Sequence, residues 1–277
     1  MSCLPGATAF RTRPRHPLRG DSPERERSMR KVTRTIVLCM AALLAIAGAT
    51  RTASAVTITW LDMSPTPSGS TVPSGSVFFV PGIGNVTLTY SMPAVMTTTR
   101  LTGGVLQAGN LVSGTYTWTN YEAFTTYFTA GPDPLVPELW SVTYTFPLSL
   151  PANVVYVGAS GMGQTTSFGG GATVVTVNQN GSFLGDWTGG GGPWGPTLFT
   201  PGAGTFAMQN SLNGAGGLDP WWNTPLGVVK ITDAVGSITI YGSQIRGDGI
   251  GFNIGFDIPL ATPASSSSWG RLKNLYR

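Results

Sequence analysis

Residues 236–259 read GSITIYGSQIRGDGIGFNIGFDIP, and this stretch decides the fold class. In its second half, apolar residues alternate strictly with small or polar ones: Ile250, Phe252, Ile254, Phe256 and Ile258 against Gly251, Asn253, Gly255 and Asp257. Period-two alternation predicts a β-strand with one buried and one solvated face. The first half, 237–245, is rich in β-forming residues, and Asp-Gly at 248–249 is typical of a tight turn. We therefore expect a β-hairpin, with the rest of the chain closing over its apolar face.

Short strand-like segments recur along the rest of the chain. Segments 76–80 and 85–90 flank a Pro-Gly turn and predict a second hairpin, whereas Pro147 is expected to end a strand at 140–146. From Gly158 to Gly217, eighteen of sixty residues are glycine, but interleaved Val, Phe, Leu and Trp favour ordered strands and loops over a linker.

The spacing of these segments defines an architecture. No helical period of ten or more residues occurs between 56 and 260. About a dozen short strands with frequent turn signals predict an all-β, antiparallel β-sandwich of jelly-roll type, with long Gly- and Trp-rich loops. We expect one domain over residues 56–260.

The N-terminal region has the organisation of a targeting segment. Residues 29–55 combine a basic start, an apolar run over 35–49 and an Ala-Ser-Ala cleavage site, which together predict a secretory signal peptide. The apolar run is shorter than the ~20 residues that a membrane span needs. Residues 1–28 are rich in arginine and precede a second Met, so we interpret them as a leader that results from a misassigned translation start, with Met29 as the native start. The protein is then secreted, to the extracellular space or the cell surface, with the periplasm as the alternative.

Cleavage after residue 55 changes the chemistry of the chain. The whole sequence carries +4, but residues 56–277 keep six basic and nine acidic residues, a formal net charge of −3. A nucleic-acid partner is excluded because no cationic face remains to hold phosphates. His16, Cys3 and Cys39 all precede the cleavage site. Zinc held by Cys or His and catalytic triads with His are therefore excluded, and we expect no enzyme.

A separate segment follows the predicted domain. Residues 261–268 form a Ser-rich linker, and WGRLKNLYR occupies 269–277. On a helix the apolar residues of this tail would gather on one side, with basic residues such as Arg277 around them: Trp269, Leu272, Leu275 and Tyr276. The tail is too short to span a membrane. We interpret it as a sorting or docking signal for secretion machinery, with a frayed end as the alternative.

This organisation resembles exported bacterial surface proteins with PEP-CTERM-type sorting signals. The resemblance covers the signal peptide, the Gly- and Thr-rich β body that ends in SQIRGDGIGFNIGFDIP, and the linker before a terminal signal. It implies a component of the cell envelope or extracellular matrix. The chain departs from that pattern because it has neither Pro-Glu-Pro nor an apolar anchor before its basic end.

Tryptophans in the glycine-rich loops are the best candidates for ligand binding. They are flanked by hydrogen-bonding side chains, and the set comprises Trp187, Trp194, Trp221, Trp222, Asp186, Asp219 and Asn223. Indole faces stack on sugar rings while polar neighbours bind the hydroxyl groups, so this set predicts a glycan site. The alternative is that the tryptophans close the ends of the sandwich as part of its core.

Carboxylates offer two further hypotheses. Asp248 and Asp257, with loop carbonyls, could hold a structural calcium ion, and solvated turn aspartates are the alternative. No other cofactor is expected. Glu122 and Glu138 are the only glutamates after residue 55, and a glycosidase or lyase would pair one of them with a second carboxylate about 5–9 Å away.

The sequence therefore leads to one expectation and two alternatives. We expect a secreted, non-catalytic β-sandwich of the bacterial cell surface or extracellular matrix that binds glycans through its Trp-bearing loops. The first alternative is a polysaccharide-acting enzyme. The second is a purely structural protein that assembles through exposed strand edges.

Overall fold

A computed structural model describes residues 55–102, 106–129, 137–163, 173–189, 195–211, 224–244 and 249–257. The chain divides into two compact units, Met1–Ala53 and Ser54–Arg277, and all described residues belong to the second. These residues form strands, turns and loops, with no helix among them, so the protein is all-β as predicted.

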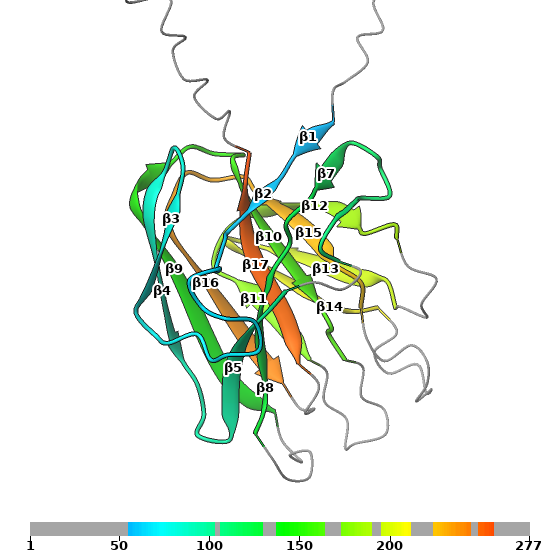
Figure 1. Cartoon of the computed structure of the whole chain (residues 1–277). Helices are drawn as coiled ribbons and strands as arrows, with labels where there is room; N and C mark the ends of the chain where they lie inside the picture. Colours follow the sequence, from blue (N-terminus) through cyan, green and yellow to red (C-terminus); the bar gives the residue numbers. More distant parts are fainter. Residues whose placement is uncertain are drawn as a thin grey trace, which may run out of the picture. The chain divides into compact units, whose positions relative to one another are not determined.

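Three sheets make up the described unit (Figure 1). The β17 sheet has the order β12-β15-β10-β17-β8-β5, with β2 also paired to β17. Its strands are β2 (Thr59–Trp60), β5 (Met96–Leu101), β8 (Ala123–Phe128), β10 (Val155–Ser160), β12 (Gly181–Asp186), β15 (Gly227–Ile231) and β17 (Ile250–Phe256).

The β16 sheet has the order β13-β14-β11-β16-β9-β4-β3. Its strands are β3 (Ser76–Val80), β4 (Gly84–Ser91), β9 (Glu138–Leu150), β11 (Val174–Val177), β13 (Thr197–Gly202), β14 (Thr205–Asn210) and β16 (Val235–Gln244). A small third sheet joins β1 (Val56–Thr57), β7 (Tyr116–Trp118) and β6 (Gly109–Asn110), and its β1–β7 pair is parallel.

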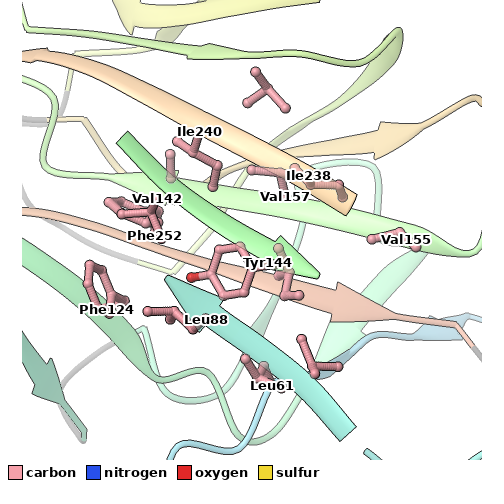
Figure 2. Close-up of a cluster of buried hydrophobic side chains, with 14 of the residues drawn as sticks. Leu61, Leu88, Phe124, Val142, Tyr144, Val155, Val157, Ile238, Ile240 and Phe252 are labelled. Carbon is pink, nitrogen blue, oxygen red and sulfur yellow. The ribbon is translucent and has the colours of Figure 1, made fainter. Parts of the chain in front are cut away.

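The two large sheets pack face to face over one inner core. Val142, Tyr144 and Ile240 of the β16 sheet belong to the same buried cluster as Val157 and Phe252 of the β17 sheet (Figure 2). Trp140 of β9 stacks on Phe252 of β17, with ring centroids 5.2 Å apart and an interplanar angle of 10°. This shared core confirms the β-sandwich, whereas the jelly-roll type stays a prediction.

The prediction of a hairpin at 236–259 is wrong, because its two strands lie in different sheets. β16 pairs with β9 and β11, whereas β17 pairs with β10, β8 and β2 in the other sheet. The connection after Gln244 therefore crosses between the sheets. By contrast, β3 and β4 form the predicted hairpin with continuous register from Ser76↔Leu88 to Val80↔Gly84.

Only one face of β17 matches its expectation. Ile250, Phe252, Ile254 and Phe256 are buried in the inner core as predicted, and Ile258 lies outside the described residues. The face with Gly251, Asn253 and Gly255 was expected to be solvated but is also buried. A second cluster, the outer cluster, covers the outer face of the β17 sheet: Ile58, Trp60, Leu111, Trp118, Tyr121, Tyr156, Trp187, Leu226 and Val228.

One strand boundary and one whole strand also differ from the sequence-based expectation. β9 continues through Pro147 to Leu150, because the β16 ladder shifts register between Val235 and Ser237 and leaves Pro147 outside the paired positions. β12 at Gly181–Asp186 was not expected, since its glycines weaken the strand pattern.

Candidate functional site

The connections at one end of the sandwich are short. Strand pairs are joined by residues 81–83, 151–154, 178–180, 203–204 and 232–234. The described chain also enters and leaves at this end, since Thr59 of β2 pairs with Phe256, the last residue of β17. We call it the turn end.

Five further connections leave from the opposite end, which we call the loop end. In the β17 sheet, Ala159 near the end of β10 lies opposite Gly227, the first residue of β15, and Gly227 also pairs with Asp186 at the end of β12. In the β16 sheet, Gln244 at the end of β16 lies opposite Glu138, the first residue of β9. The same strand termini therefore gather at one end within each sheet.

Contacts between the sheets show that these termini share one end of the sandwich. Thr197 N–H, at the start of β13, donates to Asp186 Oδ2 at 3.1 Å. Gln244 Oε1 accepts from Thr126 Oγ1 of β8 at 2.9 Å and from Trp140 Nε1 of β9 at 3.2 Å. The five connections that span 129–137, 161–173, 187–196, 211–226 and 245–249 thus begin and finish at the loop end.

Most residues of the predicted glycan site lie outside the described residues. They fall within two of those five connections, 187–196 and 211–226: Trp194, Trp221, Trp222, Asp219 and Asn223. Their flanking residues are described and lie at the loop end. The strand registers therefore bring together connections that are far apart in the sequence.

Trp187 is described, and it lies in the outer cluster. Trp187 is 8% exposed. Its backbone N–H donates to Leu226 O at 2.9 Å, and its backbone forms an isolated antiparallel β-bridge with Leu111. A Cβ on Gly109 or Gly189 would collide with the indole, so both glycines pack tightly against it. For this residue the core alternative applies, because its ring leaves no open face for a sugar.

Asp186 is the predicted polar residue that the structure describes at the loop end. Its carboxylate accepts the Thr197 N–H, and its carbonyl accepts the Val112 N–H at 3.0 Å. Burial raises the pKa of Asp186, and hydrogen bonding to Thr197 opposes this rise. The carboxylate therefore joins the ends of β12 and β13 at an electrostatic cost.

Asp186→Asn is expected to make the chain at least as stable as the wild type at pH 7. Asparagine keeps an oxygen that can accept the Thr197 N–H but carries no charge. Because the folded pKa lies above the unfolded value of about 3.9, the aspartate stabilises the fold less as pH rises from that value through the folded pKa. Urea midpoints between pH 4 and 7 should show the advantage of the variant growing with pH.

The exposed Asp62 provides the matched control for this titration. Asp62→Asn removes the same charge from an exposed side chain, so it should change the free energy of unfolding at pH 7 by less than about 0.5 kcal/mol. A D186N variant that is less stable than the wild type at pH 7, with an unchanged profile, would contradict the assignment.

The predicted calcium residues flank opposite ends of β17. Asp257 follows β17 at the turn end, where its N–H donates to Val154 O at 3.0 Å. Asp248 lies outside the described residues, but Gly249 precedes β17 at the loop end. Seven residues of strand separate these ends by about 20 Å, so the geometry does not favour one ion shared by both carboxylates. Among the described residues, no three His, Cys, Asp or Glu side chains lie close enough together to hold a metal ion.

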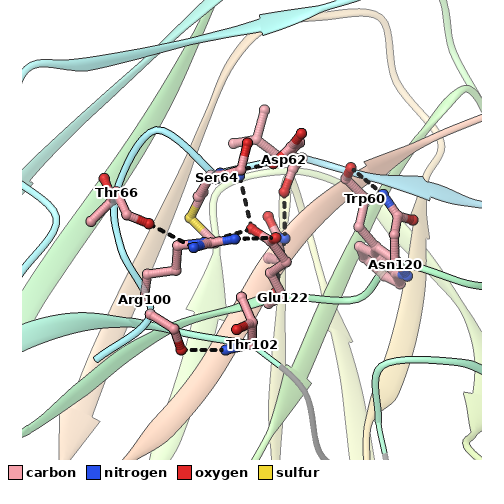
Figure 3. Close-up of polar contacts among 12 residues, drawn as sticks. Trp60, Asp62, Ser64, Thr66, Arg100, Thr102, Asn120 and Glu122 are labelled. Carbon is pink, nitrogen blue, oxygen red and sulfur yellow. Dashed lines mark hydrogen bonds and ion pairs between the residues drawn. The ribbon is translucent and has the colours of Figure 1, made fainter. Parts of the chain in front are cut away.

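Glu122 forms a buried ion pair with Arg100 (Figure 3). The guanidinium donates to both carboxylate oxygens, from Nε at 3.0 Å and from Nη2 at 2.6 Å. Met63 N–H donates to Glu122 Oε2 at 2.9 Å, and Arg100 Nη1 donates to Thr66 O at 2.6 Å. The hydrogen bonds to Glu122 raise the pKa of Arg100, and burial opposes this rise. The bonds to Met63 and Thr66 fix residues 63–66 against the Arg100–Glu122 pair.

The sequence named Glu122 as a candidate catalytic carboxylate but did not predict that the side chains of Arg100 and Asn253 contact this residue. Arg100 is one of only two basic residues between 56 and 245, which was the available signal. Asn253 is fully buried, and its side chain donates to Leu61 O at 3.0 Å and to Glu122 O at 2.9 Å. Glu138, the other candidate, starts β9 opposite Gln244.

The fold defines a class of protein, an all-β sandwich with a small third sheet on one face. No family model matches the sequence, and neither a curated protein nor a solved structure matches the chain. Within the described residues there is no helix long and apolar enough to cross a membrane. The predicted leader at 1–28, residues 29–54 of the predicted signal peptide, and the predicted docking tail with Trp269, Leu272, Leu275, Tyr276 and Arg277 lie outside the described residues.

Proposed function

We propose that the protein is a secreted, non-catalytic component of the bacterial cell surface or extracellular matrix that binds a polysaccharide at its loop end. One observation carries the proposal: the two connections that hold Trp194, Trp221, Trp222, Asp219 and Asn223, residues 187–196 and 211–226, begin and finish at the same end of the sandwich. Loops gathered on a rigid scaffold are the usual location of binding residues in β-sandwiches.

The residue types in these connections favour a carbohydrate. Indole rings offer flat apolar faces for the C–H faces of sugar rings, and Asp and Asn side chains can bind hydroxyl groups. The body carries more acidic than basic residues, so a neutral polysaccharide suits it better than an acidic one. The pairing of Glu122 with Arg100 and Met63 N–H supports a non-catalytic role, because this carboxylate is already engaged.

The position of the turn end supports display on a surface. Asp257, from which the chain continues into the linker and tail, follows β17 at the end opposite the loops. If secretion machinery anchors the chain by its tail, the loop end is free to face outward. The tail and the loops then have separate roles, attachment and binding.

A glycan array with the full chain tests the binding part of this proposal. Trp221→Ala and Trp222→Ala should each weaken retention of the bound polysaccharide by about tenfold, as expected for loss of one stacking contact of ~1–1.5 kcal/mol. Tyr241→Ala is the matched control, because Tyr241 is an aromatic residue exposed on the face of β16 and lies in none of the five connections at the loop end. Equal retention by all variants, or none by the wild type, would contradict glycan binding here.

A further inference from the structure

The two large sheets have four edges, and at two of them pairing with another strand is blocked in different ways. The edge strand β13 contains Pro201, which has no N–H to donate. The edge of β5 is covered by a loop of the same chain: Arg100 N–H donates to Ser70 O at 3.0 Å, and Gly69 N–H donates to Arg100 O at 2.7 Å. Such features keep sheet edges from joining other chains.

The edge strand β12 is also interrupted. Its register shifts at a bulge between Phe183 and Gly185, and the Asp186 carbonyl at its end accepts the Val112 N–H. A regular strand from another molecule could not follow this edge along its length.

β3 is the remaining edge, and within the described part of the chain nothing pairs with its outer side (Figure 1). Its sequence, SVFFV, contains no charge, no proline and no glycine, and its register with β4 has no bulge. Phe78 and Val80 point into the inner core, whereas Val77 is 52% and Phe79 is 68% exposed on the opposite face. β3 therefore combines an open backbone edge with exposed apolar side chains.

We propose that β3 pairs antiparallel with β3 of a second copy of this chain. An antiparallel edge is its own complement about a two-fold axis. In the register with the greatest overlap, the two-fold axis runs between the two strands, midway between the Phe78 residues of the two copies. Val77 of each copy then lies opposite Phe79 of the other. Cross-strand pairs of a β-branched and an aromatic residue stabilise sheets by about 0.2–1 kcal/mol each.

The charge distribution also fits a second copy. Among the residues of the seven strands in the β16 sheet, only Glu138 is charged, and it lies at the start of β9 rather than beside β3. Two copies can therefore join at β3 without bringing charged residues of these strands together. A dimer joins the two β16 sheets into one continuous sheet, and this inference is independent of the glycan proposal.

The size of the contact sets its strength. A five-residue edge buries less than the roughly 800 Å² per partner of a standard interface. The dimer is therefore weak in dilute solution and is populated when copies are crowded together.

Sedimentation velocity of the full chain over a wide concentration range tests the proposal. The wild type should shift from monomer to dimer as concentration rises. Val77→Lys and Phe79→Glu should each raise the dissociation constant by about tenfold or more, because each removes both Val77–Phe79 pairs and places a charge on the edge. Mixing V77K with F79E should restore a dimer, since the introduced lysine and glutamate then lie opposite each other.

Tyr241→Lys provides the control, because Tyr241 is 48% exposed on the same face but three strands from the edge. It should leave the dissociation constant unchanged, and far-UV circular dichroism should show that all variants fold. A wild type that stays monomeric at the highest concentration overturns the proposal. A dimer that V77K and F79E both retain, or a mixture of the two that stays monomeric, overturns it as well.

Discussion

Trp60→Ala is expected to destabilise the folded chain by about 3–5 kcal/mol, the range for truncation of a large buried aromatic residue. Trp60 is the central side chain of the outer cluster. Its ring makes edge contacts with Trp118 and Tyr121, at centroid distances of 6.2 and 5.0 Å. It also lies on the backbone of β10 and β17, where Gly158 and Gly255 leave room for it. Urea denaturation, followed by circular dichroism, measures the loss.

A double-mutant cycle with Gly158 distinguishes this packing from a general effect of truncation. A Cβ on Gly158 would lie 2.7 Å from Trp60 Cη2, so Gly158→Ala should cost about 1–3 kcal/mol in the wild type. In the W60A background this collision is absent, so the same change should cost much less. Additive costs would contradict the placement of the indole on Gly158.

Trp60→Phe separates the packing of the ring from its polar atom. Trp60 Nε1 is buried without a hydrogen-bond partner in the described part of the chain. Phenylalanine loses part of the ring but also loses this unpaired N–H, so its cost should fall well below that of alanine.

The outer cluster explains which part of β17 the sequence could predict. The face of β17 that carries Ile and Phe was predicted correctly, because large apolar side chains at every second residue of a strand indicate a face buried in the core. Glycine at positions 251 and 255 fits a solvated face and a tightly packed one equally well. At Gly255 the deciding residue is Trp60, almost 200 residues away in the sequence, and at Gly251 the deciding residues are Ala123 and Ser160.

The wrong hairpin has a similar cause. Asp-Gly at 248–249 favours a tight turn, but turn chemistry does not say whether the next strand returns to the same sheet. The pairing partners of β16 and β17 come from β9, β11, β10 and β8, and long-range pairing of this kind has no local signal.

The candidate site was predictable only in part. Composition identified the Trp-bearing loops, and the strand registers place their ends together. Whether a tryptophan is exposed depends on its neighbours, and Trp187 is buried by Leu111 and by Gly109, which a search near position 187 does not reveal. Glu122 looked like a free carboxylate because Arg100 lies on another strand.

Arg100→Met is expected to lower the free energy of unfolding by about 2–4 kcal/mol. The side chains of Arg100 and Glu122 are 10% and 14% exposed, so removal of the guanidinium leaves a largely buried carboxylate without its cation and the Thr66 carbonyl without its donor. Loss of one member of a buried pair costs ~3–5 kcal/mol, against at most ~1 kcal/mol for an exposed pair. The value expected here lies between them because the pair retains some contact with water.

Two variants serve as controls for this prediction. Lys230→Met removes the same charge from a side chain that has no ion pair among the described residues, so it should change stability by less than about 0.5 kcal/mol. Arg100→Met combined with Glu122→Gln should recover part of the loss, because the remaining group is neutral and can still accept the Met63 N–H. Equal losses in R100M and K230M would contradict the ion-pair assignment.

The same pair should also control the accessibility of the β5 edge. It fixes residues 63–66, and the loop continues to Gly69 and Ser70, which cover the backbone of Arg100. When the guanidinium is removed, the loop loses that attachment, and the Gly69 and Arg100 amides should exchange with solvent faster while amides of β17 stay protected. Hydrogen exchange measured on R100M tests this expectation. If the Gly69 amide remains as protected as in the wild type, the loop covers the edge without help from the ion pair, and an R100M chain should then gain no new tendency to aggregate.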